Sequence, residues 1–179
     1  MTDDLGTHIL QDIALVYRQQ RRLAEAAARQ LDDEQFFHAP TPDANSVAVI
    51  MKHVGGNLRS RWTDFLTSDG EKPDRNRDGE FMVEGESRAS VMQTWDDGFA
   101  SLEGALSALT AADLARTVTI RGEPHTVVQA LIRNLAHTSH HAGQVVHLAK
   151  MLTGSAWLTL SIPRGGSKQV LGNFWVAAR

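Results

Sequence analysis

Four of the eight histidines fall within one short segment, Asn134–His147. His137 and His141 are four residues apart, so on a helix their imidazoles project from adjacent turns of the same face. Two imidazoles at that spacing can hold one divalent ion while the helix keeps both Cα atoms in place. The sequence contains no cysteine, so a metal site would have to use nitrogen and oxygen ligands. The pair therefore predicts a metal site that needs a third ligand from elsewhere.

His53 is the best candidate for that third ligand. It lies beside the apolar face of a second expected helix, far from the pair in sequence. At about 100° per residue, His137 and His141 lie on the flank of the apolar stripe of their own helix. His140 and His147 fall on the opposite side, toward solvent or a partner subunit. Periodicity thus selects His53, His137 and His141 as side chains able to converge at one rim of a helical protein.

Ordinary structural roles for these residues stay open at this point. Histidines four residues apart often only hydrogen-bond or face solvent, and His53 alone fits a half-buried position. Gly143 and the pair Gly55–Gly56 fit close helix contacts, because a glycine inside a helix costs about 1 kcal/mol against alanine. Trp62 and Trp95 are expected in the core rather than against a ligand.

The elements that must position the histidines read as four long helices. Apolar residues recur at helical spacing over residues 3–30, 45–66, 87–109 and 126–152. Asn45 or Ser46 is the expected N-cap of the second helix, and Ser87 that of the third. Thr126 and Gln129 form a capping-box pattern at the start of the fourth.

The connections between these helices complete the expected architecture. A polar stretch over residues 68–85 is longer than most loops in compact domains. Two short β-prone pieces on either side of Arg121–Gly122 predict a small hairpin, and residues 155–179 are expected to be irregular. The sequence therefore predicts one all-α domain, 1–179: a four-helix bundle with a long crossover loop and a hairpin before the last long helix.

Composition narrows the classes of protein to which the chain could belong. Of its 179 residues, 42% are hydrophobic and 22% charged, which is typical of a soluble globular protein. The net charge of −3 and the scattered basic residues argue against nucleic acid or an anionic membrane as a partner. We find no spanning apolar run and no signal segment, so a cytoplasmic location is expected by default.

Three parts of the sequence together resemble the DinB-like superfamily, in particular an uncharacterised branch of unknown function. They are the helix that carries His53, the segment His137–Gln144 and the ending Trp157–Ser167. The similarity runs over nearly the whole chain. It implies an up-down-down-up four-helix bundle, commonly a homodimer, in which three histidines bind a divalent metal. Carried over residue by residue, those ligands are His53, His137 and His141.

The resemblance also implies a class of reaction. Characterised relatives include transferases that use bacterial low-molecular-weight thiols, so the expected function is a metal-dependent, thiol-dependent S-transferase. Three nitrogen ligands leave a coordination position open for catalysis, and Zn²⁺ or Ni²⁺ suits imidazole ligands. No acidic residue obviously pairs with the trio as a general base, which disfavours a metal-dependent hydrolase. A non-catalytic dimeric module that binds metal or ligand is the other alternative.

Further residues are candidates for roles around the metal. Asn57 and Gln144 are expected to orient a ligand or the substrate. Arg164 could bind an anion, although an exposed polar turn fits its spacing better. Apolar residues outside the main stripes predict a homodimer: Trp157, Phe174 and Trp175.

Overall fold

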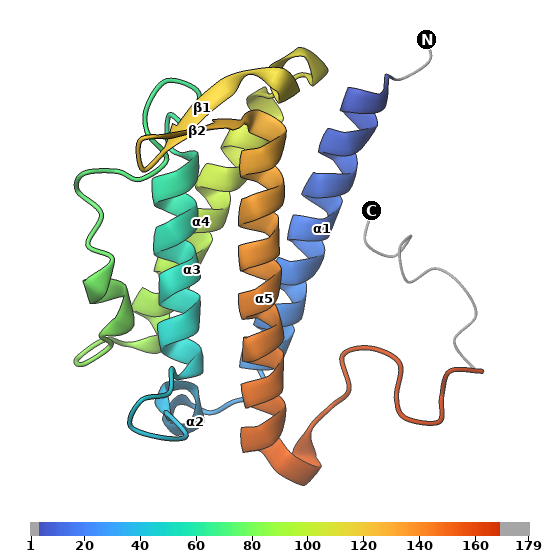
Figure 1. The fold of residues 1–179 in the computed structure, drawn as a ribbon. Coiled ribbons are helices and arrows are strands. Elements are labelled where there is room, and N and C mark those ends of the chain that lie inside the picture. Colours follow the sequence, from blue (N-terminus) through green and yellow to red (C-terminus); the bar gives the residue numbers. More distant parts are fainter. Residues whose placement is uncertain (1–3, 169–179) are drawn as a thin grey trace.

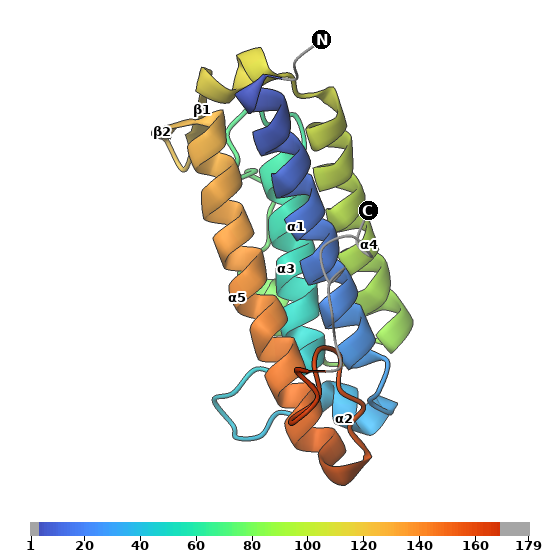
Figure 2. The same ribbon diagram turned by 90° about the vertical axis from the view of Figure 1, so that its right-hand side faces the viewer.

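The computed structural model describes residues 4–168, and this part of the chain is mostly helical. Four long helices stand side by side along one axis (Figures 1 and 2): α1 (Leu5–Ala28), α3 (Val47–Trp62), α4 (Arg88–Ala108) and α5 (Val127–Thr153). Helices α1 and α5 run in one direction, and α3 and α4 run in the opposite one (Figure 1). The all-α expectation is confirmed for the described residues. None of their helices is both long and apolar enough to cross a membrane.

The long helices begin where capping residues end the preceding loops. The Ser46 hydroxyl accepts a hydrogen bond from the Val49 N–H at the start of α3. Ser87 caps α4 in the same way. Thr126 and Gln129 form the expected reciprocal capping box at the start of α5. These predicted helix starts are confirmed.

One helix end and one additional short helix differ from the expectation. Helix α3 ends at Trp62 rather than near residue 66, because Asp64 adopts a left-handed conformation with φ of 48°. The short helix α2 (Asp33–Phe37) was not expected. It begins with a capping box between Asp32 and Gln35. Five residues are too few to show a helical apolar stripe, which is why periodicity does not predict it.

The expected hairpin is present and anchors the long loop between α3 and α4. Strands β1 (Thr117–Ile120) and β2 (Glu123–Thr126) pair antiparallel around a turn at Arg121 and Gly122. The Asp69 carboxylate accepts hydrogen bonds from both turn N–H groups, each at 2.8 Å. The loop is therefore tied to the hairpin, and it goes on to form the 3₁₀ helix η1 (Asp78–Phe81). A second 3₁₀ helix, η2 (Ala111–Ala115), lies between α4 and β1. A last one, η3 (Gly154–Ala156), follows α5.

The core lies between the long helices, and the backbones of α3 and α4 lie close together at two glycines. A Cβ on Gly98 would lie only 2.4 Å from the Gly55 carbonyl oxygen. The close contact expected at Gly55 is confirmed. Gly143 differs, because the position of its missing Cβ faces open space. Among residues 4–168, the largest fully buried side chains come from four different helices: Tyr17, Phe36, Met51, Leu58, Trp95 and Phe99.

Candidate metal centre

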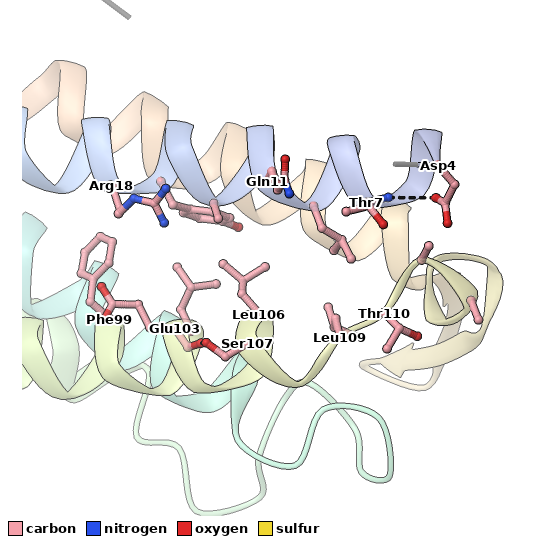
Figure 3. Close-up of a pocket in the computed structure, with 16 residues that line it drawn as sticks. Asp4, Thr7, Gln11, Arg18, Phe99, Glu103, Leu106, Ser107, Leu109 and Thr110 are labelled. Carbon is pink, nitrogen blue, oxygen red and sulfur yellow. Dashed lines mark hydrogen bonds between the residues drawn. The ribbon is translucent and has the colours of Figure 1, made fainter. Parts of the chain in front are cut away.

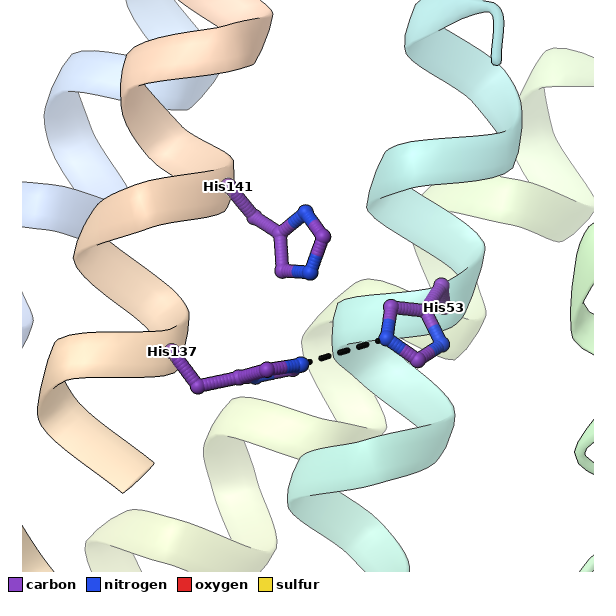
Figure 4. Close-up of side chains that lie close together, drawn as sticks. All are labelled: His53, His137 and His141. Carbon is purple, nitrogen blue, oxygen red and sulfur yellow. Dashed lines mark hydrogen bonds between the residues drawn. The ribbon is translucent and has the colours of Figure 1, made fainter. Parts of the chain in front are cut away.

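The three histidines selected by spacing converge between α3 and α5. His53 comes from α3, and His137 and His141 come from α5 (Figure 4). One nitrogen from each ring lies within 4.8 Å of the other two. His140 and His147 are exposed, as their helical positions predict. The structure therefore separates the four histidines of α5 into two that face the centre and two that do not.

His53 is held from two sides by η1. Its Nδ1 donates a hydrogen bond to Glu80 Oε2 over 2.8 Å, since a carboxylate can only accept. The Phe81 ring packs against the imidazole with a centroid distance of 4.8 Å. The bond to Glu80 keeps the His53 proton on Nδ1, so Nε2 offers a lone pair to the centre.

Glu80 is in turn fixed by Arg75. The Arg75 Nε donates to Oε1 over 2.7 Å, and its Nη2 donates to Oε2 over 2.8 Å. Burial raises the pKa of Glu80, but the hydrogen bonds from His53 and Arg75 outweigh it and hold the pKa below its usual value. Glu80 is therefore a carboxylate whose two oxygens are both occupied.

Sequence reasoning missed Glu80, because it lies in a polar loop without periodicity. The one sequence signal for it is Gly56. A Cβ at Gly56 would lie 2.5 Å from Glu80 Oε1, so this helical glycine makes room for the carboxylate. The two adjacent glycines thus allow two close contacts: Gly55 lies against α4, and Gly56 lies against η1.

His141 has a neighbour of its own on α5. Its Nδ1 lies 2.7 Å from Gln144 Oε1, which accepts the Nδ1 proton when the amide is oriented as found. Burial is the main cause that lowers the pKa of His141, so the ring is neutral at neutral pH. Gln144 therefore contacts the histidine cluster, and His141 Nε2 is left as the nitrogen able to bind a metal.

His137 completes a donor set that fits a divalent metal. Burial, helped by the neighbouring His141 and His53, lowers its pKa to about 3, so it too is neutral. Its Nε2 lies 3.2 Å from His53 Nε2. Two nitrogens bound to tetrahedral zinc at 2.0–2.1 Å are about 3.3 Å apart, close to this distance. Neutral imidazoles at that separation are the donors that zinc and nickel prefer.

A comparison with family models covers almost all of this architecture. Residues 4–166 match the model described as "Protein of unknown function (DUF1572)". The chain belongs to this family. No curated protein matches it. The matched residues include the three histidines and Glu80, so the centre lies within the part that defines a DUF1572 protein.

A cavity of about 190 Å³ borders the centre of this DUF1572 protein. His53 and His137 form part of its lining, and so does Asn57. The Asn57 side chain is buried, and its Oδ1 accepts a hydrogen bond from Asn134 Nδ2 over 2.8 Å. Asn57 therefore lies in the wall of the cavity beside the histidines.

Arg164 does not join the site. It is exposed in the segment after α5 and does not line the cavity beside the histidines. Within residues 4–168 it forms no hydrogen bond or ion pair. Arg164 therefore does not bring an anion-binding group to the histidine centre of this DUF1572 protein.

A larger cavity of the DUF1572 chain lies elsewhere. It has a volume of about 690 Å³ and lies between α1 and α4 (Figure 3). Leu10, Phe99 and Leu106 supply much of its apolar lining, and Arg18 and Glu103 are also part of the wall. None of the three clustered histidines reaches it. Size therefore does not identify the site here, and the smaller cavity adjoins the metal-binding groups.

Proposed function

We propose that this protein is an enzyme that uses one divalent metal ion, zinc or nickel, held by His53, His137 and His141. The observation that supports this proposal most directly is that three ring nitrogens, held by two helices, lie within 4.8 Å of one another. The carboxylate behind His53 strengthens the case, because metal-binding histidines commonly donate their second N–H to such a group.

A catalytic centre fits better than a structural one. Three protein ligands leave a coordination position open, whereas structural zinc sites use four. A small molecule in the cavity beside His53 and His137 would lie next to the ion. When bound, the ion supplies a Lewis acid that lowers the pKa of a thiol or water molecule.

We further propose a thiol-dependent S-transferase built on the DinB-like, up-down-down-up bundle. The resemblance to DinB-like thiol transferases supports this reaction. In such a step, the thiol sulfur forms a bond to an electrophilic carbon of the second substrate. The leaving group departs with the electron pair of its bond, and the thiol proton passes to solvent. Glu80 is unsuited to activate water for hydrolysis, because His53 and Arg75 occupy both of its oxygens.

The test combines metal analysis with a turnover screen. Elemental analysis of the purified full chain should find about one zinc or nickel per chain. The loaded protein should then consume a thiol in a screen of several low-molecular-weight thiols against several electrophiles, while His137→Ala should not. Bound metal without any turnover would point to a non-catalytic binding module. Release of product without consumption of thiol would point to a hydrolase.

A further inference from the structure

Arginines gather around the cavity that borders the histidines. The lining contains one from α3, two from the loop, one from the hairpin and one from α5: Arg61, Arg75, Arg77, Arg121 and Arg133. No aspartate or glutamate is part of this lining. In a chain with a net charge of −3, this wall is a local concentration of positive charge.

Carboxylates neutralise only part of this charge. Arg75 pairs with Glu80 and Glu71, and Arg121 pairs with Glu71 over 3.3 Å. Arg61 and Arg133 form no ion pair within residues 4–168. Arg133 Nη1 donates a hydrogen bond to His125 Nε2 over 3.0 Å, and the other N–H groups of Arg133 stay available to a ligand. In the described chain, no carboxylate therefore lies within ion-pair distance of these two guanidinium groups.

Arg61 gives the strongest indication that an anion binds in this cavity. Arg61 is only 7% exposed, and its buried Nη1 has no hydrogen-bond partner in the described part of the chain. Burial and the neighbouring Arg133, Arg75 and Arg121 lower the pKa of Arg61, although Glu71 opposes them. Burial of an unpaired guanidinium group disfavours folding, because the charge loses its hydration without gaining an acceptor. An anion in the cavity would provide that acceptor.

Asn57 adds a neutral donor to the same wall. Asn134 Oδ1 accepts hydrogen bonds from the Tyr17 hydroxyl at 3.0 Å and the Trp62 indole N–H at 2.9 Å. This fixes the Asn134 amide, whose Nδ2 then donates to Asn57 Oδ1. The Asn57 oxygen is thus occupied, and its Nδ2 protons remain for a ligand in the cavity.

We propose that this cavity binds the oxyanion, a carboxylate or a phosphate, of the small-molecule substrate. Arg61 and Arg133 supply the charge, because guanidinium N–H groups match the geometry of oxyanions, and Asn57 supplies a further donor. A volume of about 190 Å³ accommodates one such group and a few more atoms. The anion site adjoins His53 and His137, so one acidic molecule can reach both. Only the statement that the anion belongs to the substrate rests on the proposed function.

The binding test uses two simple probes. Inorganic phosphate and succinate are titrated calorimetrically into the full chain, both metal-loaded and after chelation. At least one probe should bind in both states, and the tighter one indicates the class of anion. Arg61→Met and Arg133→Met should each weaken binding about tenfold or more. Arg59→Met is the matched control, because Arg59 is exposed on the same helix and does not line this cavity.

A second readout keeps the test decisive. Without a probe, Arg61→Met should raise the melting temperature, because it removes an unpaired buried charge, and its metal content should equal that of the wild type. Arg133→Met, at an exposed position, tests the site even where Arg61→Met fails to fold. Equal affinities in the Arg61, Arg133 and Arg59 variants would overturn the anion site. Arginine-dependent anion binding in a protein that binds no metal would instead uphold this site and overturn the proposed function.

Discussion

His53 is the most constrained of the three clustered histidines. It is 5% exposed, its Nδ1 is bonded to Glu80, and the Phe81 ring packs against its imidazole. Within residues 4–168, the one hydrogen bond of the His141 ring is with Gln144 on its own helix. In this centre the His53 ring is therefore oriented before a metal binds. The positions of His137 and His141 relative to each other depend on helix α5 alone. A ligand held in advance loses less conformational freedom when the metal binds.

Replacement of single histidines tests the ligand assignment. His53→Ala and His137→Ala should each remove most of the bound metal, because a site with two ligands is far weaker than one with three. His140→Ala should retain it, since His140 is exposed. Elemental analysis after desalting measures the contrast. Equal metal loss in His140→Ala and His137→Ala would contradict the assigned helix faces.

Glu80→Gln tests the carboxylate behind His53. The amide keeps the size of the side chain but removes its charge, so metal affinity should fall about 10- to 100-fold. Competition with a chromophoric chelator gives the dissociation constant. Glu84→Gln, an exposed change in the same loop, is the control and should leave the constant unchanged. Identical constants in the two variants would show that Glu80 does not act on the metal.

At the scale of elements, the sequence predicts the helices that are long enough to show a periodic apolar pattern. It does not predict the elements that are too short to show one. The long helices are predictable because apolar periodicity and caps such as Ser46, Ser87 and Thr126 mark them. The helices α2 and η1 are too short to carry a period. Periodicity also sorts the histidines of α5, because a helix fixes which side chains share a face.

The surroundings of the histidines are less predictable for a physical reason. Glu80 and most of the cavity arginines come from the loop and the hairpin, whose side chains acquire neighbours only when the chain folds back. In the sequence these arginines look scattered, yet they share one wall in the structure. Local spacing carries no information on such contacts.

The contact between α3 and α4 gives a stability prediction. Gly98→Ala should lower the free energy of unfolding by about 1–3 kcal/mol or more, since its Cβ would meet the rigid backbone of Gly55. Urea denaturation of the variant measures the change. Gly104→Ala is the matched control on α4, because the position of its Cβ is open, and it should be neutral or stabilising by up to about 1 kcal/mol. Equal stability of the two variants would contradict the close approach.

At the scale of the whole molecule, we propose a homodimer formed along the outer face of α5. Exposed residues at spacings of three and four form a stripe there: Ile132, Ala136, His140, Gly143, His147 and Met151. The open space at Gly143 would let a second backbone approach. Trp157 is half-buried against the core of its own chain, so only part of its side chain is exposed for such an interface. Phe174 and Trp175 lie outside the described residues.

Light scattering at micromolar concentration tests the dimer. The wild type should give twice the mass of one chain, and Ile132→Glu should give the mass of one, because a charge on the stripe opposes apolar contact. Ala100→Glu, an exposed change on α4, should stay dimeric. A wild type of single-chain mass would refute the proposal.

The distance along the chain between the ligands also bears on how the protein comes apart. His53 and His137 are 84 positions apart, so in an unfolded chain only the local pair on α5 remains near one ion. The ion would therefore bind the native state far more tightly than the unfolded chain. Helices α3 and α5 could then separate only after a coordination bond breaks. The bound ion would therefore lower the rate of unfolding. In guanidinium chloride, added nickel should lengthen the unfolding half-life of the wild type, and His53→Ala should unfold at one rate with or without the metal.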